Sequence, residues 1–411
     1  MVLERIRERD RKLVKLAKRV RVLGTLSWPL SVEQAFIDSV ARGDRQLPAP
    51  PPVTVDLGDV RDGLVSLRTD LDRANPLEAF LDRTALNLLR TVELLETAHT
   101  PRFTEISSEL YGRPTDRLHP AAPSHLEGAR HFVEQSICPG VPVPQAILSD
   151  EQAAQAIRDA LTPYFGADSL PVELDPELAS KASAGSRRVA LRAGATFSSV
   201  AVRQLVEHEA LVHTATKRAG QAQPVLTALG VSTARTTVAQ EGLATLAELI
   251  TDTMDLARLR RVALRIVAIQ AALDGADFLQ VFDLYLEAGQ ERGEAYYSAQ
   301  RVFRGGDVRG RVAFTKDVVY LRGLSRVRTF LLQAVQAGRL GLPRVLFSGR
   351  MTLGDALELE PFFDDGTLRF GDVLPSWVGN TSCLAAYLTW SAFNERASLA
   401  RISLDNFREP S

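Results

Sequence analysis

Two histidines, His208 and His213, lie five positions apart in a segment with a helical pattern, and this spacing is the strongest constraint on the fold. Glu209 directly follows the first histidine. In an ideal helix of about 3.6 residues per turn, the two imidazoles point roughly 140° apart. They converge on one metal ion only if the helix is locally widened, for instance by a π-bulge. The alternative is that His213 is a polar residue on another face of the helix.

A third candidate ligand, Glu241, lies downstream in the sequence QEGLA, residues 240–244, which we expect to open a new helix. Imidazole nitrogens and carboxylate oxygens are common zinc ligands, and three protein ligands leave a fourth position for water. A glutamate beside a ligating histidine is suitably located to take a proton from that water. The segment is therefore a candidate hydrolytic zinc site.

Several short blocks extend this pattern over most of the chain, from about residue 80 to 390. They read HEALVH at 208–213, QP at 223–224, QEGLA at 240–244, LYG at 110–112, FRGG at 303–306 and AFTKDVVYL at 313–321. With these blocks the chain resembles the bacterial QEGLA-motif proteins, named as modulators of flavohaemoglobin expression. That family is related to the eukaryotic microtubule-associated tyrosine carboxypeptidases. The resemblance implies that His208, His213 and Glu241 hold Zn²⁺ and that Glu209 is the catalytic acid and base.

Length and composition limit the class of protein. A chain of 411 residues can bury a large core in one or two domains. A net charge of -1 lacks the basic balance of a nucleic-acid-binding protein. Two isolated cysteines, Cys138 and Cys383, indicate a reducing compartment. Because the chain has neither a long apolar run nor the apolar block of a signal peptide, we expect a cytoplasmic enzyme without a membrane span.

The patterns predict an α+β fold that is mainly helical, with a zincin-like metallopeptidase core and a small sheet beside the HExxxH helix. We expect an N-terminal helical extension with a proline-rich linker at 1–52, a helical subdomain at 53–180 and the catalytic region at 181–411. Residues 1–22 have the period of an amphipathic helix rich in lysine and arginine. Acidic residues dilute its charge, so docking on the protein body is favoured over a membrane surface.

Two features beside the histidine segment have alternative interpretations. Residues 188–192 alternate as a short strand, which either offers an exposed edge to an extended peptide or only completes a small sheet. Ser198 or Ser199 is expected to cap the helix that follows. Glu248 lies seven residues after Glu241 and nearly eclipses it on a helix. It either accepts a hydrogen bond from a ligating histidine or lies on a solvated face.

An arginine-rich block, residues 301–328, is the second informative region. Its glycines, Gly305, Gly306 and Gly310, permit unusual backbone geometry and a close approach to a ligand. The candidate substrate-binding cations of the block are Arg304, Arg311 and Lys316. A guanidinium can bind a terminal carboxylate through two parallel hydrogen bonds, and the Tyr320 hydroxyl can stabilise an oxyanion. The alternative is a solvated basic loop.

Together these features predict a zinc metallopeptidase that hydrolyses a peptide or amide bond. A carboxypeptidase removing a C-terminal residue is favoured, with tyrosine as the residue that the resemblance implies. One alternative is a hydrolase of a small amide or a modified peptide. The other is a zinc-binding regulatory protein without turnover, although such a protein does not need Glu209 as a general base.

Overall fold

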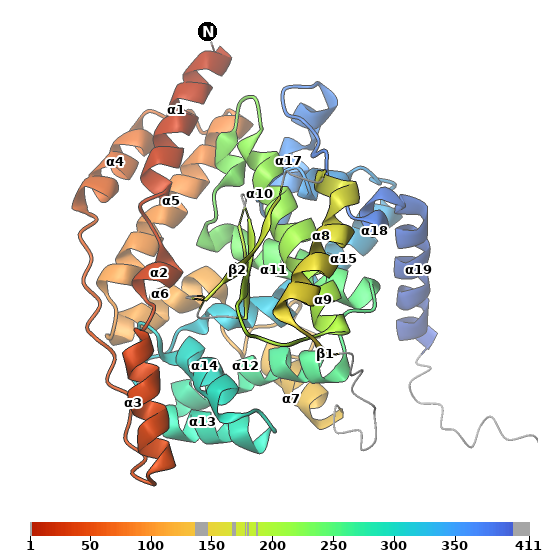
Figure 1. Ribbon diagram of the computed structural model, residues 1–411. Helices are drawn as coiled ribbons and strands as arrows, with labels where there is room; N and C mark the ends of the chain where they lie inside the picture. Colours follow the sequence, from red (N-terminus) through yellow and green to blue (C-terminus); the bar gives the residue numbers. More distant parts are fainter. Residues whose placement is uncertain are drawn as a thin grey trace, which may run out of the picture.

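The computed structural model describes residues 2–135, 147–166, 170–176, 178, 181–185 and 188–397. Helices make up most of this part of the chain, and its short strands form two small sheets (Figure 1). This confirms the mainly helical α+β class. None of the described helices is both long and apolar enough to span a membrane. Cys138 lies outside the described residues, and Cys383 is exposed.

The first part of the chain is helical and is drawn in red and orange in Figure 1. It contains α1 (Val2–Ala17), α2 (Val22–Thr25), α3 (Leu30–Ala41), α4 (Gly58–Thr69), α5 (Pro76–Glu96), α6 (Pro101–Tyr111) and α7 (His125–Gln135). As expected, α1 docks on the protein, because Ile6, Leu13 and Ala17 are buried. These side chains belong to a hydrophobic core that continues as far as Leu388.

A three-stranded sheet precedes the histidine segment. It has the order β2-β4-β3, in which β4 (Val189–Arg192) pairs in parallel with β2 (Val172–Asp175) and antiparallel with β3 (Ala182–Ala184). The expected strand is therefore present, and the alternative of an exposed edge is excluded, because both edges of β4 are paired. A peptide cannot add to β4, which only completes a small sheet.

Next comes a helix whose middle is π-helical. Strand β1 (Ile147–Leu148) and helix α8 (Asp150–Phe165) precede the three-stranded sheet, and β5 (Phe197–Ser198), which follows that sheet, pairs antiparallel with β1. Ser198 then caps α9 (Ser199–Leu205) by accepting a hydrogen bond from the Ala201 N–H. The chain continues as the π-helix η1 (Val206–Thr214) and then as α10 (Ala215–Gln221). The widening predicted from the histidine spacing is confirmed.

The helix that carries Glu241 is α11 (Ala234–Ile250), which follows the short 3₁₀ turn η2 (Thr227–Gly230). The expectation that Glu241 opens this helix is wrong, because Glu241 lies in the middle of α11. The remaining elements are α12 (Leu256–Asp274), α13 (Phe278–Glu287), α14 (Arg292–Phe303), η3 (Thr315–Val318), α15 (Val319–Gln336), α16 (Leu342–Leu346), α17 (Leu353–Asp364), α18 (Ser376–Gly379) and α19 (Thr381–Ala397).

Helices α11 and α15 cross at two glycines, Gly242 and Gly323. A Cβ atom added to Gly242 would lie 2.4 Å from the Gly323 carbonyl oxygen, so only glycine permits this approach. The glycine of QEGLA is thus explained by packing, and its neighbours Leu243 and Ala244 are buried in the core.

Candidate metal centre and active site

His208, His213 and Glu241 come together although they belong to two separate helices. Their potential ligand atoms lie within 4.8 Å of one another. The Oε2 atom of Glu241 lies 3.5 Å from the Nε2 atom of each histidine. The π-helix makes this possible, because its i→i+5 hydrogen bonds bring residues five apart onto nearly the same face. The structure therefore excludes the alternative in which His213 lies on another face.

The three residues fit a zinc ion. Ligands at about 2.0–2.2 Å in a tetrahedron lie roughly 3.4 Å from one another, close to the two observed separations of 3.5 Å. The Glu241 Oε2 atom is also buried without a hydrogen-bond partner among the described residues. A buried carboxylate oxygen without a partner is costly, and a cation between it and the imidazoles would satisfy it.

Glu248 orients the first histidine. Its Oε1 atom lies 2.6 Å from His208 Nδ1, and its side chain is fully buried. Arg258 donates to both of its carboxylate oxygens at 2.9 Å, and Gln204 donates to Oε1 at 3.1 Å. The solvated-face alternative for Glu248 is therefore wrong. Because Nδ1 is engaged with Glu248, Nε2 is the nitrogen that faces the other ligands.

Electrostatics favour a cation at this centre. Burial by itself lowers the pKa of His208, but the adjacent Glu241 carboxylate and the hydrogen bond with Glu248 outweigh it and raise that pKa to about 10. Burial likewise raises the pKa of Glu248, whereas His208 and Arg258 bring it down to about 2. The pKa of Glu241 is well below its usual value because Lys316 and both histidines overcome its burial. The carboxylates that favour a proton on His208 would equally favour a metal cation, and the two compete for the same nitrogen.

Glu209 is the most open group of the centre. Its side chain is 32% exposed, against 5% for His208 and 13% for Glu241. Its Oε1 atom lies 3.9 Å from His208 Nε2, the nitrogen that faces the other ligands. The carboxylate thus lies beside the centre on a side that solvent reaches, as a group that takes a proton from water requires.

A cluster of cations borders the centre on one side. Lys316 Nζ lies 3.6 Å from Glu241 Oε1, so it holds the carboxylate oxygen that does not face the histidines. Arg301 donates to both oxygens of buried Asp317, at 2.5 and 2.9 Å. The Tyr320 hydroxyl lies 3.4 Å from Arg301 Nη2, and Arg265 lies over the Tyr320 ring at 4.6 Å. Lys316 thus contacts the centre, and Tyr320 lies next to it, with Lys316 Nζ 5.6 Å from the Tyr320 ring.

Arg304 and Arg311 differ sharply in their surroundings. Arg304 Nε is buried without a hydrogen-bond partner among the described residues, and burial together with nearby Arg301 lowers the Arg304 pKa to about 10. Arg311 is exposed, and its guanidinium lies beside Gly275 at the C-terminal end of α12. Arg258, which contacts Glu248, lies near the other end of that helix, about 25 Å away at 1.5 Å per residue. The structure does not bring Arg311 to the centre.

The glycines of the same loop serve packing within the protein. Gly305 and Gly310 have positive φ values of 76° and 95°. A Cβ atom on Gly305 would meet Phe103, and one on Gly310 would meet the Gly275 carbonyl. The backbone geometry is unusual, as expected, but the close approach is to the protein's own chain and not to a ligand.

Sequence reasoning missed Arg350, which contacts a metal-ligand residue. Its Nη2 atom donates to the His213 carbonyl at 3.0 Å, and its Nη1 atom donates to Ser232 Oγ. Burial lowers the Arg350 pKa to about 10, although Glu241 and Glu209 act in the opposite direction. A single arginine 137 residues after His213 carries no local motif, so only the tertiary structure reveals this contact.

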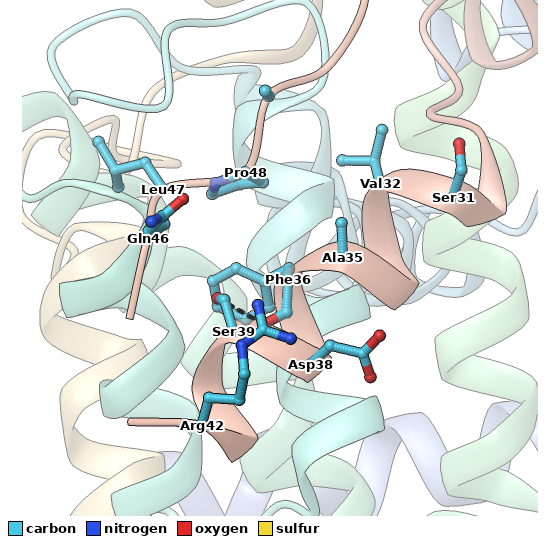
Figure 2. Close-up of a pocket in the computed structure, with 11 residues that line it drawn as sticks. Ser31, Val32, Ala35, Phe36, Asp38, Ser39, Arg42, Gln46, Leu47 and Pro48 are labelled. Atoms are coloured by element: carbon cyan, nitrogen blue, oxygen red, sulfur yellow. Dashed lines mark hydrogen bonds between the residues drawn. The ribbon is translucent and has the colours of Figure 1, made fainter. Parts of the chain in front are cut away.

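A surface pocket lies elsewhere, between α3 and the segment that follows it (Figure 2). Its lining includes Phe36, Ser39, Arg42 and Leu47, and Ser39 Oγ donates to the Phe36 carbonyl. No residue of the metal centre lines this pocket. It offers no arrangement of catalytic groups and does not bear on the chemistry of the centre.

Comparison with known proteins agrees with the motifs. A family model described as microtubule-associated tyrosine carboxypeptidase matches residues 34–396, which include the metal centre and the cation cluster. No curated protein matches the sequence. Because the match covers most of the chain and all the candidate site residues, the chain belongs to the microtubule-associated tyrosine carboxypeptidase family.

Proposed function

We propose that this protein is a zinc-dependent metallocarboxypeptidase with a zincin-like core, in which His208, His213 and Glu241 hold the metal. The observation that carries this proposal is the convergence of two imidazoles and an unpartnered carboxylate oxygen, with Glu209 beside them. The family match supports a peptidase. Zinc bound there would supply Lewis-acid chemistry and lower the pKa of a water molecule.

The protein's own groups carry the remaining steps. Glu209 accepts the proton of the attacking water and later passes it to the leaving amine. Glu248 keeps His208 in the orientation and tautomer that a ligand needs. Lys316 holds the outer oxygen of Glu241. The Tyr320 hydroxyl, held near Arg301, donates a hydrogen bond to the oxyanion that forms on the substrate carbonyl.

We assign recognition of the substrate's terminal carboxylate to Arg304. Lys316 already pairs with Glu241, and Arg301 already pairs with Asp317. Arg304, in contrast, has no ion pair within the described part of the chain, and its Nε is buried without an acceptor. Asp317 acts on Arg304 only at longer range and already pairs with Arg301, so an anionic substrate group would stabilise the Arg304 guanidinium. The arrangement supports removal of single C-terminal residues, with tyrosine as the first residue to test.

The proposal is tested on matched peptides with a free-acid or an amidated C-terminus, ending in tyrosine or in other residues. Zinc-loaded protein should release single residues from the free acids in a mass-spectrometric time course. Amidation removes the charge that Arg304 recognises, so its cost should be about 1.5–3 kcal/mol, or roughly ten- to a hundredfold in kcat/KM. Equal cleavage of both forms, or internal cuts, would indicate an endopeptidase.

The metal is tested separately by elemental analysis of the purified protein. About one zinc per chain is expected from a single three-ligand site. A protein with zinc that cleaves none of the peptides would favour a small-amide substrate or a regulatory role.

A further inference from the structure

The connection between the two metal-binding segments is held tightly. Residues 222–233 join α10, which continues the histidine-bearing helix, to α11, which carries Glu241. Within this connection, η2 packs directly on α10. A Cβ atom on Gly220 would lie 2.2 Å from the Leu229 carbonyl oxygen, and one on Gly230 would lie 2.5 Å from Gln221 Cγ. With backbones this close, a displacement of η2 displaces α10 as well.

The N-terminal helix α1 holds η2 from outside. Asp10 is 1% exposed, and its Oδ1 atom accepts a hydrogen bond from the Ala228 N–H at 2.8 Å. Its Oδ2 atom accepts from the Thr227 N–H at 2.9 Å and from the Thr227 hydroxyl. Arg7 Nε donates to the Pro224 carbonyl at 3.0 Å in the same connection. A buried carboxylate with three donors from one turn fixes that turn strongly.

Arg350 links the same turn to a metal ligand. Its backbone N–H donates to the Leu229 carbonyl at 2.6 Å, directly after the residues that Asp10 holds. Its guanidinium donates to Ser232 and to the His213 carbonyl, at the end of the π-helical turn. A continuous set of hydrogen bonds therefore runs from α1 through η2 and Arg350 to His213.

We propose that α1 is a brace of the metal centre, in which Asp10 and Arg350 are positioning residues: Asp10 holds η2, and Arg350 links η2 to His213. The three ligands come from two helices, so their spacing depends on how firmly the connection between those helices is held. The family match begins at residue 34, so α1 lies before the matched region. The inference rests on the proposed function, because it requires that the centre binds zinc.

The test measures zinc dissociation constants by competition with a chromophoric chelator. Asp10→Asn keeps the size of the side chain but directs an NH₂ group at backbone donors. Arg350→Lys keeps the charge but removes the fork that contacts Ser232 and His213. Each substitution should weaken zinc binding by about tenfold, the usual cost of losing a group that orients a ligand. Because Asp10 and Arg350 are successive links of one route to His213, the double variant should lose much less than the product of the two effects.

Arg9→Gln is the matched control. Arg9 is the neighbour of Asp10 and ties α1 to Glu78 on α5, without a contact to η2 in the described structure. It should leave zinc affinity unchanged within about twofold. Thr227→Val, which removes only the hydroxyl donor to Asp10, should give a severalfold loss and tests the same contact if Asp10→Asn does not fold. Replacing zinc by Co²⁺ adds a visible spectrum, which should change in Asp10→Asn and not in Arg9→Gln.

The outcomes separate the two proposals. Parent protein that binds no zinc would overturn the proposed function. Parent protein that binds zinc, with Asp10→Asn and Thr227→Val binding it equally well, would overturn the brace alone. An equal loss of zinc affinity in Arg9→Gln and Asp10→Asn would mean that general loosening of α1 is responsible. Fully additive losses in Asp10→Asn and Arg350→Lys would mean that the two residues act on the metal centre by separate routes. Either result also overturns the brace.

Discussion

The Nδ1 atom of His208 lies 2.6 Å from the Oε1 atom of Glu248, in a fully buried contact between the π-helix and α11. Glu248 lies two turns beyond Glu241 on α11, so one helix face supplies both a proposed metal ligand and the group that orients His208. Arg258 compensates the charge of Glu248 through two hydrogen bonds. The centre therefore depends on helix packing as much as on its three ligands.

Glu248→Gln should weaken zinc binding by about ten- to a hundredfold, because an amide holds the His208 imidazole less strongly than a carboxylate does. It should also lower thermal stability, because Arg258 loses its buried counter-charge. Glu207→Gln, the same change beside His208, is the control for zinc affinity. Chelator competition and thermal unfolding measure the two effects, and equal zinc affinity in the two variants would contradict the role of Glu248.

Glu209→Gln and Glu241→Gln make the same chemical change at two carboxylates with different proposed roles. Glu241→Gln should lose most of the bound zinc, because a neutral amide is a poor replacement for a carboxylate ligand. Glu209→Gln should retain zinc and lose about 10²–10⁴-fold in kcat, because it removes only the proton acceptor. Elemental analysis and peptide hydrolysis distinguish the two. Full activity of Glu209→Gln would exclude it as the base.

Arg304→Met should reduce kcat/KM for free-acid peptides by about ten- to a hundredfold and leave the amides unaffected, because only the free acids supply the anion. Its thermal stability should be unchanged or higher, since a buried charge without an ion pair is removed. Arg311→Met, at the exposed loop beside Gly275, should change neither kcat/KM for the free-acid peptides nor thermal stability. If Arg311→Met shows the loss and Arg304→Met does not, the assignment of the carboxylate site is wrong.

Gly242→Ala should lower the free energy of unfolding by about 1–3 kcal/mol, because its methyl group would force α11 away from α15. It should also weaken zinc binding, since Glu241 precedes it. The control is Gly128→Ala in α7, where an added Cβ meets no atom within 4 Å. That variant should be unchanged or more stable by up to about 1 kcal/mol. Chemical denaturation compares them, and equal stability of both variants would contradict the steric explanation.

Local sequence patterns determined much of the secondary structure. The capping box at Ser149 and Gln152 marks the start of α8, and Gly166 marks its end. Both signals depend only on contacts within one helical turn, so the sequence reveals them. The histidine spacing showed that two ligands five residues apart converge only on a widened helix, and the π-helix η1 provides that widening. The start of α11 was misjudged, because no side-chain cap marks it at Thr233.

Contacts between distant segments were decided only by the tertiary structure. Arg350 and Asp10 carry no local motif, and they act on the centre through residues more than 100 positions away. The cations of the arginine-rich block looked alike in sequence, yet packing buried Arg304 without an ion pair, held Lys316 against Glu241 and left Arg311 exposed. The sequence determines which ligand types are available and the local helix geometry that presents them. The burial and the partners of each side chain set its charge and its role, and these depend on how separate helices pack.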